Sequence, residues 1–186
     1  MSNKPASPEW FRERGEKRLE DWWESIPVGE FYGLCGAHYA VGPREFEYIP
    51  TPNGEFGFID SAGQDHRPDV FRHDFGSTDV ARGLPYLSKI EFPQAYLIHD
   101  WDFYRNHACA LVGKVYDRTL EQAGATLIES IKTLVVKGHD GVFWKCPPLV
   151  ANRIYRTVTS AVARRIWEDH TNPKSLSIDL ALDATS

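Results

Sequence analysis

A histidine and an aspartate stand next to each other, at His99 and Asp100, in a segment with helical periodicity that opens at Pro93. Proline suits the first turn of a helix, because the amide hydrogen that it lacks has no partner there. Neighbouring side chains leave a helix about 100° apart, so one can face the interior while the other reaches a cleft. A buried imidazole beside a carboxylate can have the tuned pKa that general-base catalysis or metal binding requires. The simpler interpretation is a buried histidine that donates to a backbone carbonyl, beside a solvated aspartate.

Two other stretches carry residue types that ligate ions. Residues 32–36 (Tyr-Gly-Leu-Cys-Gly) have the glycines of an ion-binding loop, but the favoured interpretation is a bent strand end with a buried cysteine. His66, Asp69, His73 and Asp74 suit a metal site by type, although their spacing fits no established metal motif.

Length, charge and cysteine usage restrict the class of protein. The 186 residues carry a formal net charge of −5 and no basic block, so a surface that tracks nucleic-acid phosphates is not expected. No apolar run is long enough to span a membrane, and the N-terminus lacks the apolar core of a signal peptide. Cys35, Cys109 and Cys146 form no Cys-x-x-Cys motif, which favours thiols in a reducing compartment. We therefore expect a soluble globular protein.

The first helix is expected to start at Ser7-Pro8 and to end before Pro27. Serine is a good N-cap, proline suits the first helical position, and apolar residues then recur at helical spacing. Trp22 and Trp23 place much aromatic surface in one turn, which predicts a packing anchor against the core.

The pattern then changes to short strands separated by turn residues. Asn53-Gly54 between apolar runs is typical of a β-hairpin. We expect one antiparallel sheet or a set of hairpins. The predicted strands cover residues 30–34, 37–41, 45–49, 56–60 and 70–75.

Three helices are expected in the C-terminal half. The central helix opens at Pro93, the second covers 120–136 with Thr119 as N-cap and Gly138 as its stop, and the last covers about 148–170. The predicted fold class is therefore α+β.

The expected organisation has one domain and two extensions. Residues 28–172 form a single α+β domain, whose β-rich first half precedes the three helices. Residues 1–27 form an N-terminal amphipathic helical arm, and residues 173–186 a loosely ordered tail.

The motifs of the C-terminal half resemble domain of unknown function 1353, a family of tailed phages, prophages and bacteria. The resemblance covers about residues 70–170 and rests on Thr-Asp-x-Ala…Pro at 78–85 and Ala-x-x-x-His-Asp-x-x-Phe-Tyr-Arg at 95–105. It implies a phage- or prophage-type protein in which Asp79 lies near His99 or Arg105. It also implies a location in the host cytoplasm or in a virion, with other phage proteins or a second copy as partners.

The same helix resembles that of phospholipase A2, particularly the bacterial type. That resemblance implies that His99 is the general base for water, that Asp100 holds Ca²⁺ and that the loop around Asp79 offers carbonyls. The acid that orients the imidazole in that family falls on Gly124 here, so the site is either active or vestigial. His99, Asp100 and Asp79 are the candidate catalytic residues. We expect weak or no Ca²⁺ binding, and we assign no metal site and no cofactor.

Two alternatives stay open. One is a phosphohydrolase that binds a metal through His73, His99, Asp100 and Asp140, because the His-Asp doublet also occurs at 73–74 and 139–140. The other is a non-catalytic virion or assembly protein, in which the three candidate catalytic residues and Arg105 form a buried polar network that holds the loop to the helices.

Overall fold

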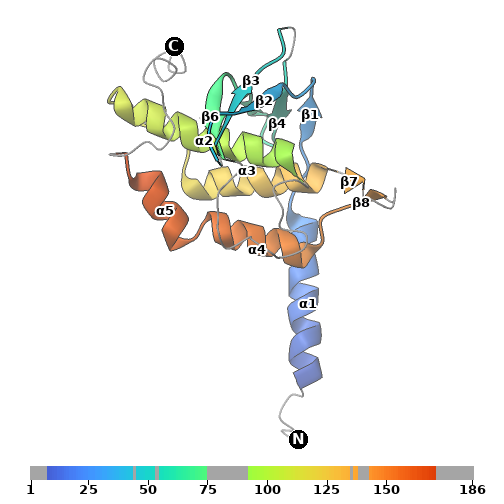
Figure 1. The fold of residues 1–186 in the computed structure, drawn as a ribbon. Helices are drawn as coiled ribbons and strands as arrows, with labels where there is room; N and C mark the ends of the chain where they lie inside the picture. Colours follow the sequence, from blue (N-terminus) through green and yellow to red (C-terminus); the bar gives the residue numbers. More distant parts are fainter. Residues whose placement is uncertain are drawn as a thin grey trace, which may run out of the picture.

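Figure 1 shows a computed structural model of the chain, in which two small sheets lie on one side of helix α2 and the other C-terminal helices on its opposite side. The order of elements confirms the predicted α+β class. No helix in the described segments is both long and apolar enough to cross a membrane. The structure describes residues 8–43, 45–52, 55–74, 92–134, 136–137 and 143–170, with side chains for those from 17 onward except 136, 137, 143 and 144.

Helix α1 (Pro8–Ser25) ends two residues before Pro27, as predicted. The N-terminal part of α1 extends away from the rest of the chain (Figure 1). Its other end is anchored by Trp23, which is 8% exposed and packs in a core cluster with residues of α2, α3 and α4. Lys132 of α3 donates to the carbonyl oxygens of Trp23 at 2.6 Å and Ile26 at 2.5 Å. A cation at the C-terminal end of a helix satisfies its last carbonyls, so Lys132 fixes the point where α1 meets the core.

Six short strands form two separate antiparallel sheets. The strand order is β1-β4-β5 in one sheet and β2-β3-β6 in the other. The bounds are β1 (Glu30–Tyr32), β2 (Ala37–Ala40), β3 (Phe46–Ile49), β4 (Gly57–Ile59), β5 (Asp65–His66) and β6 (Phe71–His73). The predicted strands are thus confirmed at five places, and the short polar strand β5 is an addition.

The hairpin predicted at Asn53-Gly54 is wrong. The strands before and after it, β3 and β4, pair with other strands and belong to different sheets. Tyr48 of β3 and Phe58 of β4 both become fully buried in one cluster against α2. Burial of large aromatic side chains outweighs the local preference of a turn sequence. The chain crosses from one sheet to the other at residues 33–36, where Gly33 has a φ of +71°, so the stretch is a bent strand end as predicted. The predicted burial of its cysteine is wrong, because Cys35 is partly exposed.

Helix α3 (Leu120–Thr133) begins with the predicted N-cap. Thr119 accepts the amide hydrogen of Gln122 and the Gln122 side chain accepts that of Thr119, which is a capping box. The predicted end near Gly138 is too late, because Leu134 already has an extended ψ of 139°. Two further short strands, β7 (Val136–Lys137) and β8 (Phe143–Trp144), follow and pair with each other.

The last predicted helix is two helices. Helix α4 (Pro148–Val158) and helix α5 (Ala161–Glu168) are separated at Thr159-Ser160, where the Ser160 hydroxyl caps α5 by accepting the Ala163 amide hydrogen. Four helices therefore stand in the described part of the C-terminal half, in place of the three predicted. The predicted tail at 173–186 lies outside the described residues.

Helix α2 (Pro93–Leu111) lies between the sheets and α3 (Figure 1). Leu97, Ile98 and Trp101 pack with the sheet aromatics, whereas Ala95 and Tyr96 pack with α3 and α4. A helix that is covered on several sides must bury whatever polar residues it carries, and each of them then needs a partner. Those polar residues are the candidate functional site.

Candidate functional site

Helix α2 directs three polar side chains toward three different neighbours. His99 turns to the backbone of α3, Asp100 faces β6, and Asp102 faces the segment that leads into α3. The adjacent His99 and Asp100 therefore do not act on one common point, because the helix separates their directions by about 100°.

The imidazole of His99 is enclosed in the core. It is 3% exposed, meets the ring of Phe103 edge-on at 5.0 Å and hydrogen-bonds the backbone of Ala123. Its Nδ1 has no hydrogen-bond partner among the described residues. Burial lowers the pKa of His99 to about 4, against the opposing effects of the Ala123 hydrogen bond and the Asp74 charge. His99 is thus a neutral core side chain at neutral pH.

Asp100 stands at one end of a row of four side chains. Its Oδ2 lies 3.8 Å from Nδ1 of His73, and Nε2 of His73 lies 3.0 Å from Nδ1 of His38. Nε2 of His38 in turn lies 3.6 Å from Sγ of Cys35. We call Cys35, His38, His73 and Asp100 the thiol–imidazole row. It joins α2 to the β2-β3-β6 sheet.

Asp102 is the centre of a second group, and its own side chain is fully buried. Its carboxylate is 1% exposed and accepts hydrogen bonds from Nη1 of Arg118 at 2.9 and 2.8 Å. The Tyr116 hydroxyl donates to the same carboxylate at 2.7 Å. Nη2 of Arg118 donates to the Thr126 hydroxyl at 2.5 Å. Burial raises the pKa of the Asp102 carboxyl, and the charge of Arg118 and the hydrogen bond from Tyr116 oppose that rise.

His66 continues this group toward the β1-β4-β5 sheet. Nη1 of Arg118 donates to Nδ1 of His66 at 2.8 Å, so the imidazole proton sits on Nε2 and faces Oδ2 of Asp60 at 3.0 Å. Burial would raise the pKa of Asp60, but the hydrogen bonds from His66 and from two backbone amides lower it. Both nitrogens of His66 are therefore occupied. We call Asp60, His66, Asp102, Tyr116 and Arg118 the ion-pair network.

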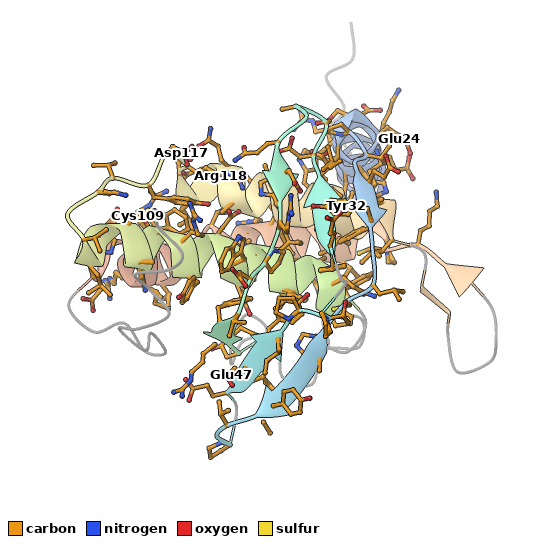
Figure 2. All side chains as sticks on the ribbon, turned by 90° about the horizontal axis from the view of Figure 1, so that it is seen from above. Glu24, Tyr32, Glu47, Cys109, Asp117 and Arg118 are labelled. Carbon is orange, nitrogen blue, oxygen red and sulfur yellow. The ribbon has the colours of Figure 1, made fainter. Side chains whose placement is uncertain are left out.

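A cavity of about 340 Å³ opens above the ion-pair network. Arg105 stacks over the ring of Trp101 at 5.8 Å in its wall. Asp117 and Arg118 lie near the start of α3 in Figure 2. Asp117 is exposed and lines the cavity, whereas Arg118 is buried. The lining residues are Gln64, Asp65, His66, Arg67, Trp101, Asp102, Arg105, Tyr116 and Asp117. The polar atoms of His66, Asp102 and Tyr116 that line this cavity already have hydrogen-bond partners within the protein.

The structure brings together few of the residues singled out in the sequence. Asp79 and Asp140 lie outside the described residues, so the predicted approach of Asp79 to His99 stays a prediction. His66 and His73 belong to different sheets and bind different partners, which separates the four residues weighed as a metal site. Among the described residues, no group of three or more His, Cys, Asp or Glu side chains has the geometry of a metal site.

Four members of the ion-pair network, and His38 of the thiol–imidazole row, are not among the residues predicted from the sequence. Tyr116 and Arg118 gave the least signal. They follow α2 in an irregular segment and belong to no motif, so their partnership with Asp102 has no signature in spacing. One signal was present, because Asp102 falls on the same helical face as the apolar Ala95 and Ile98. An acid on an apolar face indicates a buried partner of opposite charge.

No protein-family model, no curated protein and no solved structure gives a significant match to the chain. The resemblances to domain of unknown function 1353 and to phospholipase A2 therefore stay predictions.

Proposed function

We propose that the chain is a phage-type virion or assembly protein in which α2 is a structural helix and His99 is not a general base. The observation that carries the proposal is the enclosure of His99, which is 3% exposed and bonded to backbone. A general base must reach a water molecule and the substrate. A carboxylate that accepts a hydrogen bond from the second imidazole nitrogen makes the histidine a better base. Asp100, the acid expected to act with His99, faces His73 instead.

The ion-pair network supports a structural role for the polar residues of α2. It links Asp60, which directly follows β4, and His66 of β5 to Asp102 of α2 and, through Arg118, to the start of α3. Removing one partner of a buried ion pair costs about 3–5 kcal/mol, because the other charge stays buried without compensation. Such a network stabilises one arrangement of sheet and helices, which is what a protein that presents fixed surfaces requires.

Exposed apolar side chains support an interaction role. Around strands β2 and β3, Leu34 is 77% exposed, Tyr39 56% and Val41 43%. Grouped apolar residues on a surface are typical of contacts with other molecules. The extended part of α1 adds a second surface that has few neighbours in the fold (Figure 1). The assignment to phages rests on the sequence resemblance alone.

Two measurements test the proposal. Purified phage particles and their assembly intermediates from a host that carries the gene are examined by mass spectrometry, and the chain is expected in them at a fixed copy number. Short-chain phosphatidylcholine is offered to the purified protein with and without CaCl₂, and no turnover that needs His99 or CaCl₂ is expected. Turnover that disappears in His99→Gln, with an unchanged melting curve, would replace this proposal with the hydrolase.

A further inference from the structure

The thiol–imidazole row has the order of a nucleophile, a base and two groups that position the base. We propose that Cys35 is a nucleophile activated by His38, with His73 and Asp100 as positioning residues, and that it accepts acyl groups from esters or thioesters. This goes beyond the assembly role and uses residues that have no part in the ion-pair network.

The positions of the imidazole protons of His73 and His38 follow from the charge of Asp100 at one end of the row. Oδ2 of Asp100 lies 3.8 Å from Nδ1 of His73, which is too far for a hydrogen bond, but its negative charge favours a proton on Nδ1 over Nε2 and leaves Nε2 of His73 as an acceptor. Nδ1 of His38 is 3.0 Å from that acceptor and therefore carries the proton between them. Nε2 of His38 is then a lone pair, 3.6 Å from Sγ of Cys35 and in position to take the thiol proton.

The strands hold the two imidazoles in place. His38 pairs with Tyr48 across β2 and β3, and His73 pairs with Phe46 across β3 and β6, so both rings flank the same strand. His38 also packs against the ring of Tyr48 at 5.3 Å. Side chains on paired strands keep their positions better than side chains on loops, which favours a preformed base.

The backbone before β2 places the sulfur. A Cβ atom on Gly36 would lie 2.1 Å from the Ile49 carbonyl oxygen, so only glycine allows the chain to pass β3 this closely. The Gly36 amide, which donates to the Tyr48 hydroxyl at 3.3 Å, also lowers the pKa of the Cys35 thiol, while burial has the larger effect and raises it to about 11. The resting group is therefore a thiol, which needs a base in order to attack.

His38 has the properties of that base. Burial lowers the pKa of His38, so the imidazole is neutral at pH 7 and can accept a proton. Cys35 and His38 are both partly exposed, whereas Cys109 is 7% and Cys146 2% exposed. Among the three thiols, Cys35 is the one that combines access from solvent with a neighbouring imidazole.

The proposed step transfers an acyl group and involves no oxidation. Sγ of Cys35 bonds to the carbonyl carbon while the thiol proton moves to Nε2 of His38. The bond from that carbon to the leaving oxygen or sulfur breaks, and His38 returns the proton to the leaving group. The products are an acyl-Cys35 thioester and a free alcohol or thiol. Water can later cleave the thioester and restore the thiol.

The test uses the full chain and p-nitrophenyl acetate. Release of p-nitrophenol is followed, and the acetyl group is located by tandem mass spectrometry. We expect acetylation of Cys35 at a rate about 10²-fold above that of the same cysteine in the urea-denatured chain, the usual scale of general-base catalysis. Cys109→Ser is the matched control and should leave the rate unchanged.

Variants of the row separate activation from mere packing. His38→Gln should reduce the native rate to that of the denatured chain. Asp100→Asn should lower the native acetylation rate less than His38→Gln does, and Asp100→Glu should keep the rate near that of wild type. A packing role alone would not produce this difference. The proposal is overturned if His38→Gln, still folded, reacts like wild type. If His38→Gln does not fold, the native-to-denatured ratio of the wild type decides, and a ratio near one refutes the proposal.

Discussion

Nη1 of Arg118 lies 2.8 Å from Nδ1 of His66, and this contact fixes the tautomer of a buried imidazole. The same nitrogen bonds both oxygens of Asp102. One guanidinium therefore connects a strand of the β1-β4-β5 sheet with the central helix.

Replacing Asp102 by asparagine should cause the largest loss of stability among changes in the ion-pair network. Asp102→Asn leaves the Arg118 charge buried without its counter-ion, and we expect the free energy of unfolding to fall by about 3–5 kcal/mol. Tyr116→Phe removes one hydrogen bond and should cost about 1–3 kcal/mol. Urea denaturation followed by circular dichroism measures both.

The matched control for this series is Asp117→Asn. Asp117 lines the cavity, is exposed and precedes Arg118, so its change should stay within about 0.5 kcal/mol of wild type. A loss in Asp102→Asn no larger than in this control would contradict the buried ion pair.

Stability should depend on pH through His99. The pKa of His99 is about 4 in the folded chain, below its ordinary value of 6.5, so the unfolded chain binds the proton more tightly. The contribution of the neutral imidazole is complete above pH 6.5 and is lost as the pH falls toward 4. The loss attributable to this group is about 3 kcal/mol.

The measurement compares wild type with His99→Gln by urea denaturation at several pH values. Burial also lowers the pKa of His38 and His107, so both proteins lose stability in acid for that reason. The difference between the two proteins isolates His99 and should shrink as the pH falls. Parallel curves would show that His99 titrates normally.

Gly124→Asp should not create a hydrolase. An ideal Cβ at Gly124 would lie 2.7 Å from Cγ2 of Thr159 and 3.4 Å from the Tyr155 ring, so the position is packed against α4. A carboxylate there is buried among apolar atoms, and we expect a loss of about 3 kcal/mol or more with no gain in ester cleavage over wild type. Thermal melts and an esterase assay measure the two effects.

A milder pair of variants checks the packing at this position. Gly124→Ala alone should destabilise the protein. The same change should cost much less in a chain that also carries Thr159→Ser, because Thr159→Ser removes the contacting methyl group. If instead Gly124→Asp folds normally and gains ester cleavage that His99→Gln removes, the site is a vestigial phospholipase-like centre.

Calcium should bind weakly or not at all. A calcium site needs six or more oxygen ligands, and Asp100, the acid implied by the phospholipase resemblance, faces the imidazole of His73. Isothermal titration with millimolar CaCl₂ should give heats equal to those of dilution. Saturable binding that Asp100→Asn removes would argue for the calcium-dependent enzyme.

Local patterns in the sequence predicted the helices better than their partners. Pro8, the Thr119 cap and the alternation of the strands are short-range signals, and the structure confirms the elements that they predict. The break at Thr159-Ser160 was missed because apolar residues recur on both sides of it with helical spacing. The adjacent positions of His99 and Asp100 predicted that their side chains leave the helix in two directions, but not which residues they meet there. Those neighbours, Ala123 and His73, come from α3 and β6 and depend on how the whole chain packs.

The order of strands in the two sheets has a consequence for how the chain folds. Strands β2 and β3 lie in sequence between the paired strands β1 and β4, and strands β4 and β5 lie between the paired strands β3 and β6. Each sheet therefore closes a loop that contains strands of the other, so neither sheet consists of strands that follow one another directly in the chain. Non-local pairing of this kind slows folding and couples the two sheets in one cooperative transition, because loop-closure entropy is lost before the contacts form. A nick between β3 and β4 lies inside both loops and would disrupt both sheets together.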